Sequence, residues 1–264
     1  MSEPVFYCRN IIKCYEGIPV VSGINLDLDT GGLISLVGPS GVGKTTLFNI
    51  LAGVDLPDKG RIFLEGEEIT GIAGRVSYMM QKDLLLEYRT VLDNVILSLL
   101  IRGHKKKAAR EYAAAFFQNF GLAGYEKKYP RQLSGGMRQR AALLRSCLQS
   151  LKISGSEPNN PVILLDEPFS ALDALTRRNM QDWFQNIVKG PSLPLGNRHL
   201  SAVLITHDVE EAIILSDRVY VLTGIPGVIS TVFDVSAPRP RSRDFSLTLE
   251  FAELKKTVLD AIEK

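Results

Sequence analysis

The stretch that decides the fold is Leu33-Ile-Ser-Leu-Val37 followed by Gly38-Pro-Ser-Gly-Val-Gly-Lys-Thr45. The first part is a short, nearly continuous apolar run, which is typical of a parallel strand covered on both faces. The second part matches the pattern GxxxxGK[ST], and a helix is predicted to begin near Lys44. Glycines let the backbone curl around an anion, and the start of a helix adds its positive dipole end. The sequence therefore predicts an α/β fold with a phosphate-binding loop.

Two side chains in this loop have predicted tasks. The Lys44 ammonium group would face the β- and γ-phosphates of a nucleotide, and the Thr45 hydroxyl would ligate magnesium. An ordinary Gly-rich turn is the alternative, but such a turn needs neither Lys nor Thr at these positions. The predicted phosphate contacts are Gly38, Ser40, Gly41, Gly43, Lys44, Thr45 and Thr46.

A second apolar run, Val162 to Leu165, ends in two acids, Asp166 and Glu167. Phosphoryl transfer needs a carboxylate near the metal, and we expect Asp166 to hold magnesium through water. Glu167 faces a different way and could polarise the attacking water as a general base. Adjacent acids after a strand are common on protein surfaces, so this prediction depends on the phosphate loop upstream.

The stretch Leu133-Ser134-Gly135-Gly136-Met-Arg-Gln-Arg140 resembles the signature of ABC transporter ATPases. Ser134 is a candidate helix N-cap, and the two glycines allow close backbone approach, which gives a second anion-binding helix start. The alternative is a simple capped helix. In the family this start meets the γ-phosphate held by the opposing subunit, so the resemblance implies a homodimer with two ATP molecules sandwiched between its copies.

Four further residues follow in the order that the family shows. By resemblance, Tyr15 stacks on adenine, and Gln81 contacts the nucleotide and its magnesium and reports their state to a membrane partner. Asp173 links the two sites, and His207 contacts the γ-phosphate and orients Glu167, so Glu167 and His207 are the implied catalytic residues. Each residue also has a simpler explanation when it is taken alone. Tyr15 could be a core aromatic and Gln81 a surface amide. Asp173 could be a helix cap and His207 a loop histidine.

The pattern of apolar residues predicts how the chain is organised. Ile24, Leu26 and Leu28 alternate with polar neighbours, as in a half-buried sheet, while residues 202–205 and 219–222 are further buried strands. Residues 83–150 are predicted to be mainly helical, because apolar residues there recur at the spacing of one helix face. The proposed helical stripe consists of Ala113, Ala114, Phe116, Phe117 and Phe120.

We therefore predict a phosphate-loop NTPase core with a mostly parallel sheet and an antiparallel β subdomain, formed by residues 1–82 and 151–238. An inserted α-helical subdomain, residues 83–150, carries the signature. A C-terminal tail, residues 239–264, has Phe251, Leu254, Val258 and Ile262 at helical spacing.

Composition limits the possible partners. The 264 residues are 45% hydrophobic, and 31 basic against 29 acidic residues leave a net charge of only +2, which gives no general attraction to nucleic acid. We interpret the basic runs 105–107 and 239–243 as solvated surface. Cys8, Cys14 and Cys147 form no CxxC pair, which favours thiols in a reducing compartment. The longest apolar run falls short of the ~20 residues of a membrane helix, so another chain would supply the span.

Two stretches are similar to the importer branch that serves nitrate, sulfonate, taurine and pyrimidine precursors of thiamine. They are Gln81 to Val95 and Pro238-Arg-Pro-Arg241. The chain has Glu87-Tyr88 where that branch usually has Pro-Trp, and Thr45-Thr46 replaces the commoner Ser-Thr. Residues 152–161 and 190–200 are longer than usual, and we interpret them as surface insertions.

The resemblance implies an ATP- and Mg²⁺-dependent ATPase subunit that powers uptake of a small solute. It would lie at the cytoplasmic face of the membrane, bound to separate permease subunits and indirectly served by a solute-binding protein. Two other classes share the phosphate loop. A soluble ABC mechanoenzyme acting on ribosomes or DNA generally has tandem cassettes or a long coiled coil, and a small-molecule kinase leaves Leu133 to Gly136 and His207 without a purpose. A nonhydrolysing regulator has no need of Lys44, Asp166, Glu167 and His207 together.

Overall fold

The structure is a computed structural model that describes residues 3–150, 160–189 and 199–263. Within these residues one sheet is antiparallel, in the order β2-β1-β4-β5. Ile24, Leu26 and Leu28 are at most 1% exposed, which confirms the predicted alternation in this region. The strands are β1 Phe6–Tyr15, β2 Ile18–Leu28, β4 Lys59–Leu64 and β5 Glu67–Glu68.

The second described sheet has the order β10-β9-β3-β8-β7-β6. All of its neighbouring strands are parallel except β9 and β10, so the predicted mostly parallel sheet is confirmed. Its strands are β3 Leu33–Val37, β6 Ser77–Met79, β7 Val162–Asp166, β8 Ser201–Ile205, β9 Arg218–Thr223 and β10 Val228–Asp234.

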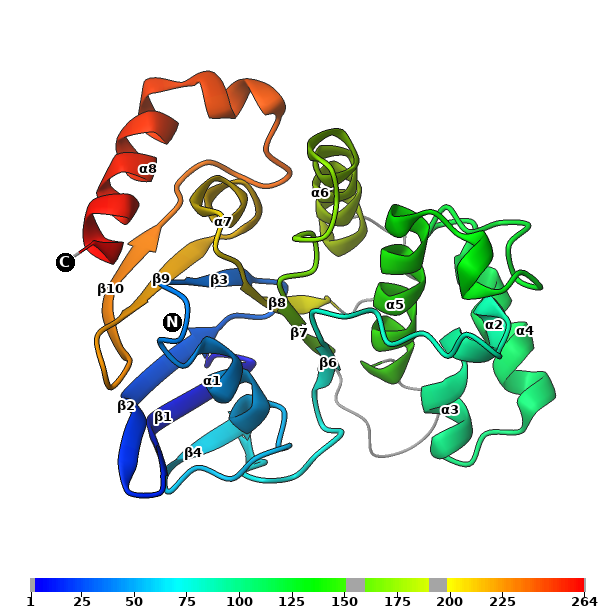
Figure 1. The fold of residues 1–264 in the computed structure, drawn as a ribbon, viewed down its shortest axis with the longest axis horizontal. Helices are drawn as coiled ribbons and strands as arrows, with labels where there is room; N and C mark the ends of the chain where they lie inside the picture. Colours follow the sequence, from blue (N-terminus) through cyan, green and yellow to red (C-terminus); the bar gives the residue numbers. More distant parts are fainter. Residues whose placement is uncertain (1–2, 151–159, 190–198, 264) are drawn as a thin grey trace.

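The helices fall into groups around this sheet (Figure 1). Helices α2 to α5 gather beyond the β6 edge, and α8 lies at the opposite end, near β9 and β10. None of the helices in the described part of the chain is long and apolar enough to cross a bilayer. Their bounds are α1 Lys44–Leu51, α2 Val91–Val95, α3 Leu97–Ile101, α4 Lys106–Phe117, η1 Pro130–Gln132, α5 Gly135–Ser150, α6 Ala174–Lys189, α7 Val209–Leu215, η2 Arg243–Leu247 and α8 Leu249–Ile262.

Helix α1 joins the two sheets. Its side chains Leu47, Phe48 and Leu51 are at most 1% exposed and pack in one cluster with residues of the antiparallel sheet and of β3, β7 and β8. Removing this much apolar surface from water is the main favourable term in folding. The burial fixes α1, and with it the phosphate loop, between the sheets.

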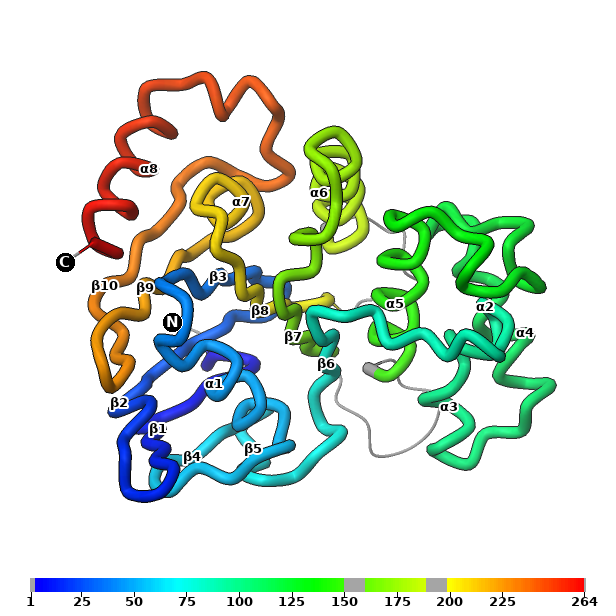
Figure 2. The backbone as a smooth tube through the Cα atoms, viewed as in Figure 1, coloured from blue at the N-terminus to red at the C-terminus, as the bar shows by residue number. Residues whose placement is uncertain are grey.

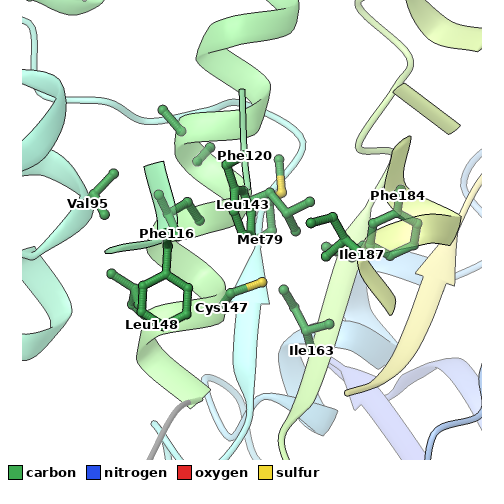
Figure 3. Packing of buried hydrophobic residues seen from close by; sticks show 14 of the residues in the cluster. Met79, Val95, Phe116, Phe120, Leu143, Cys147, Leu148, Ile163, Phe184 and Ile187 are labelled. Carbon is green, nitrogen blue, oxygen red and sulfur yellow. The ribbon is translucent and has the colours of Figure 1, made fainter. Parts of the chain in front are cut away.

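The opposite face of the parallel sheet shares a core with the helices (Figure 3). Met79 of β6 and Ile163 of β7 lie in one cluster with Leu143 of α5 and Phe116 of α4. The predicted stripe is correct except at Ala114, which is exposed; Ala109 takes its place, because positions 109, 113 and 116 share a helix face. The boundaries at residues 82, 150 and 238 stay predictions, and the insertions 152–161 and 190–200 lie largely outside the described residues.

The C-terminal segment corrects one interpretation. The run 105–107 is exposed, but Arg239 and Arg241 are not solvated surface. Arg239 makes two 2.7 Å hydrogen bonds to the Asp217 carboxylate, and Arg241 is 5% exposed and donates to five backbone carbonyls. These arginines fasten the segment that leads to α8, whose Phe251 and Val258 are buried against α7 and β9, as the helical spacing predicts.

Candidate functional site

The phosphate loop joins the end of β3 to the start of α1, and two of its glycines are dictated by space. At Gly38 (φ +156°) a Cβ atom would lie 2.1 Å from the carbonyl oxygen of Leu222. At Gly43 (φ +103°), the N-cap of α1, a Cβ atom would lie 2.6 Å from Cγ1 of Val21. Only glycine tolerates both the close approach and the positive φ. The loop is thereby held with the start of α1 at its end.

Lys44 is turned into this loop. Its Nζ donates to the carbonyls of Gly38 and Pro39, both at 2.8 Å, and the residue is 8% exposed. Burial lowers the pKa of Lys44, and the charges of Glu167 and Asp166 oppose that shift. These two hydrogen bonds therefore hold the ammonium group at the phosphate site, and a phosphate oxygen could take the place of the carbonyl acceptors.

Asp166 ends β7 beside Thr45. Its Oδ2 lies 3.5 Å from the Thr45 hydroxyl and accepts a 3.3 Å hydrogen bond from the Tyr78 hydroxyl. Burial, followed by the charge of Glu167, raises the pKa of Asp166, and burial also raises the pKa of Tyr78. The sequence did not single out Tyr78; only its position near the end of a strand beside β7 could have indicated it.

Glu167 follows in a strained backbone conformation. Its φ is +47°, which is uncommon for a residue with a side chain and is frequent at functional sites. The Glu167 amide donates a hydrogen bond to the Ile205 carbonyl at 2.9 Å. The carboxylate accepts a 2.9 Å hydrogen bond from Gln81 Nε2 and lies 3.5 Å from Nδ1 of His207. Three residues from three different strand ends thus meet at one carboxylate.

The signature residues lie elsewhere. Ser134 caps α5 by accepting a 3.3 Å hydrogen bond from the Met137 amide, as predicted, and both Ser134 and Gly135 are exposed. A Cβ at Gly136 would come within 3.0 Å of the Thr176 side chain, so glycine lets α5 start close to α6. Helices α5 and α1 lie on opposite sides of the parallel sheet (Figure 1). Within the described chain, the contacts of Ser134 to Gly136 do not reach the Lys44 loop.

Tyr15 stands at the end of β1 and is 45% exposed. Its hydroxyl donates to Asp55 at 2.6 Å, and Nζ of Lys13 lies 5.0 Å from the ring centroid while pairing with Asp55 at 2.9 Å. The hydrogen bond to Asp55, followed by burial, raises the pKa of Tyr15. The ring is therefore fixed, yet open to solvent, as a stacking surface requires. The sequence did not point to Lys13 or Asp55.

Asp173 is the cap of α6. Its Oδ1 accepts from the amides of Leu175 and Thr176 at 3.1 and 3.0 Å. Hydrogen bonding from the Thr176 side chain and backbone lowers the pKa of Asp173. The simple helix-cap explanation therefore accounts for its contacts in one copy of the chain, and the linking role stays a prediction.

The fold and the site define a nucleoside triphosphatase with a phosphate loop. A family model described as "ABC transporter" matches residues 21–170, and the chain belongs to this family as an ATP-binding, ATP-hydrolysing subunit.

Three relatives illustrate the similarity. An uncharacterised ABC transporter ATP-binding protein of Methanocaldococcus jannaschii is 37% identical, over 97% of this chain and 90% of the relative. The aliphatic sulfonates import ATP-binding protein of Bacillus cereus is 35% identical over 93% and 89%. The formylaminopyrimidine import ATP-binding protein of Halalkalibacterium halodurans is 40% identical over 79% and 75%.

The fold is also found among solved structures. The cassette MJ0796, in a dimeric post-hydrolysis state bound to ADP and Pi, has a TM-score of 0.68 at 24% identity, covering 88% of this chain and 100% of that one. This likeness confirms the fold.

Proposed function

We propose that the chain powers a membrane importer, working as a pair of identical copies that close on two ATP molecules and reopen after hydrolysis. The observation that carries the proposal is the placement of Glu167, whose carboxylate is held between Gln81 and His207 beside the phosphate loop. The separation of Ser134 and Gly135 from that loop supports the pairing. Because both residues are exposed, a second copy could approach them, and one ATP would then contact Lys44 of one copy and Ser134 of the other.

A magnesium ion fits the site. Thr45 and Asp166 offer hard oxygen atoms 3.5 Å apart, and the pKa of Asp166 is raised by burial and then by the charge of Glu167, both of which a bound cation would offset. We assign Thr45 and Asp166, with the Gln81 side-chain oxygen, as the residues that would hold it. When bound, the ion supplies charge neutralisation for the phosphates.

The chain's own residues account for the hydrolytic step. Water attacks the γ-phosphorus, Glu167 accepts the water proton, and the bond to the β-phosphate oxygen breaks to release ADP and phosphate. Gln81 and His207 hold the Glu167 carboxylate in place, and Lys44 is within the loop to offset the charge on the phosphates. Tyr15 would carry the adenine ring.

Permease subunits are the proposed membrane partners, at the cytoplasmic face. Exposed apolar side chains gather near the segment after β6, where Met80, Leu84 and Tyr88 are 41%, 52% and 76% exposed. Met80 and Leu84 line a groove with Val54 and Arg145, and Tyr88 lines a second groove with Leu100. Glu87-Tyr88 keeps an aromatic side chain on this surface. A helix of another chain would bury these side chains.

The proposed cargo is a small anion of the nitrate, sulfonate or taurine type, or a pyrimidine precursor, delivered by a solute-binding protein. Support comes from the relatives named for import of aliphatic sulfonates and of formylaminopyrimidine. The test is to co-express the chain with candidate permease and solute-binding subunits, beginning with any that are encoded beside its gene, and then to measure uptake of each labelled solute into vesicles. Co-purification with ribosomes in place of a permease would overturn the importer proposal.

The site chemistry is tested with Glu167→Gln. We expect unchanged nucleotide affinity, at least hundredfold slower turnover and a stable ATP-bound dimer on size exclusion, because amide nitrogen cannot accept the proton. Glu210→Gln, an exposed acid on α7, is the control and should hydrolyse ATP normally. Normal turnover in Glu167→Gln would refute the assignment of the base.

A further inference from the structure

The segment between β6 and α2, residues 80–90, is fastened to helix α5. Figure 2 shows it leaving the parallel sheet and crossing beside α5 before it reaches α2. Arg145 donates to the backbone carbonyls of Asp83 and Leu84 at 2.6 and 2.8 Å, and burial lowers the pKa of this arginine. From α2, the fully buried Asn94 bonds to both the amide and the carbonyl of Leu86. The segment is therefore attached to the helices rather than to the sheet.

Arg138 makes the attachment closest to the signature. Its guanidinium pairs with the Asp83 carboxylate through two hydrogen bonds, Nε at 2.8 Å and Nη2 at 3.1 Å, and with Glu87 at 2.8 Å. Burial alone would raise the pKa of Asp83, but the hydrogen bonds from Arg138 and the Leu85 amide, together with the charges of Arg138 and Arg145, outweigh burial and lower it. Glu87, which stands where the importer branch usually has proline, is thus the second anchor of the loop. An arginine that pairs with two carboxylates is held more strongly than one in an isolated, exposed ion pair.

These contacts form a continuous path through the chain. The Arg138 amide bonds to the Ser134 carbonyl at 2.9 Å, one helical turn from the start of α5. Arg138 then holds Asp83, two residues after Gln81, and Gln81 bonds to Glu167 at 2.9 Å. In the proposed dimer, Ser134 contacts one ATP and Glu167 acts on the other. Arg138 lies on the path between Ser134 and Glu167, and the proposal gives it no contact with either ATP.

We propose that Arg138 is a positioning residue that ties the placement of Gln81 against Glu167 to the position of the signature helix, and so links the two ATP sites through one chain. This inference rests on the proposed two-site function. When the start of α5 engages one ATP, the bonds from Arg138 to Asp83 and Glu87 move or restrain residues 80–90 with the helix. Glu167 of the same chain is thereby aligned for the other ATP. These contacts link the two ATP sites physically only if breaking the Arg138 bonds changes the coupling between the sites.

The test uses the full chain carrying Arg138→Gln, with Arg110→Gln as the matched control. Arg110 also makes a bidentate pair, to Asp93 at 2.8 and 2.9 Å, but on α4 and away from Gln81. In Arg138→Gln we expect kcat to fall about tenfold, which is ~1.4 kcal/mol in the barrier, with KM within about twofold. The Hill coefficient for ATP should fall toward one. Arg110→Gln should keep all three values, and Arg138→Lys should recover part of kcat.

Two further measurements separate positioning from a general loss of structure. Trypsin cleavage after the exposed Lys82 should accelerate in Arg138→Gln while the urea midpoint stays that of the Arg110→Gln control. In a double-mutant cycle, adding Asp83→Asn to Arg138→Gln should slow turnover no further, because both remove the same pair. Wild-type kcat and Hill coefficient in Arg138→Gln, or additive losses in the cycle, would overturn the proposal.

The failure of the underlying function has a different signature. If Glu167→Gln formed no ATP-dependent dimer, the two-site function itself would be wrong, whatever Arg138 does. If that dimer forms, and also forms in Glu167→Gln with Arg138→Gln added, the sandwich is intact. A loss of kcat in Arg138→Gln is then caused by the loss of the bonds from Arg138 to Asp83 and Glu87.

Discussion

Arg241 and Gln185 hold one another by a pair of hydrogen bonds. The backbone amide of Arg241 donates to Oε1 of Gln185 at 2.7 Å, and Nε2 of Gln185 donates to the Arg241 carbonyl at 3.4 Å. The pair joins the C-terminal segment to α6. It also aims the Arg241 guanidinium at the carbonyls that end α7, where the helix dipole is negative. Burial lowers the pKa of Arg241 to about 10, so the side chain remains charged at neutral pH.

Arg241→Leu should therefore lower the free energy of unfolding by about 2–4 kcal/mol, because several buried carbonyls lose their donor. The measurement is urea denaturation. Arg243→Leu serves as its control, since Arg243 forms an exposed pair with Asp182 and should cost less than about 1 kcal/mol. Equal effects of the two substitutions would show that Arg241 is not a structural anchor.

The raised pKa of Asp166 predicts a pH-dependent stability. The folded protein binds this proton more tightly than the unfolded chain, so stability should fall as the pH rises from the ordinary value of 3.8 toward the raised folded value. Asp166→Asn should remove that slope and raise the free energy of unfolding at pH 7 by about 1 kcal/mol or less, while abolishing ATP hydrolysis. Urea titrations over the range of about pH 4 to 7 would measure this slope.

In that experiment Asp182→Asn, an exposed acid on α6, should leave both slope and turnover unchanged. A variant Asp166→Asn that is less stable than the wild type at neutral pH would contradict the assigned cause.

Space at the phosphate loop predicts unequal effects of two alanine substitutions. Gly38→Ala sets a Cβ against the backbone oxygen of Leu222, which cannot easily move, whereas a Cβ at Gly41 (φ +81°) meets nothing within 4 Å. Gly38→Ala should cost about 2–4 kcal/mol or prevent folding, and Gly41→Ala about 1 kcal/mol from its positive φ alone. Chemical denaturation decides; similar costs at the two positions would refute the steric argument.

The fixed Tyr15 ring predicts a change in KM. Tyr15→Ala should raise KM for ATP about tenfold with little change in kcat, because stacking a base on an aromatic ring contributes ~1–3 kcal/mol. Tyr15→Phe keeps the ring and should stay near the wild type. Asp55→Asn, which weakens the bonds to Lys13 and Tyr15, should fall between them. An unaltered KM in Tyr15→Ala would exclude stacking.

The phosphate loop could be predicted from the sequence because its chemistry needs consecutive residues. The apolar strands were predicted for a similar reason, since burial on both faces leaves a continuous hydrophobic run. The contacts of Asp166 with Tyr78, and of Arg138 with Asp83, join residues 88 and 55 positions apart. No local pattern encodes such pairs, so they emerge only once β6, β7 and α5 are packed.

The misread residues have physical causes as well. Counting charges cannot tell a solvated arginine from Arg241, whose partners are backbone carbonyls and therefore invisible in composition. The spacing predicts Ala114 in the helical stripe wrongly, because alanine suits either face of a helix. The roles of the site residues remain predictions, because they depend on nucleotide and on a second copy of the chain.

The apolar cluster that runs from the parallel sheet through α5 to α4 constrains how this ATPase can move. Side chains from both parts share one buried cluster, so the helices cannot swing away as a separate lobe without exposing Met79 and Ile163 to water. We therefore expect any motion that follows nucleotide turnover to be a small sliding of packed side chains past one another. In the proposed importer, the permease would then be driven by a stiff body whose travel is limited to the small distance over which such packing can shear.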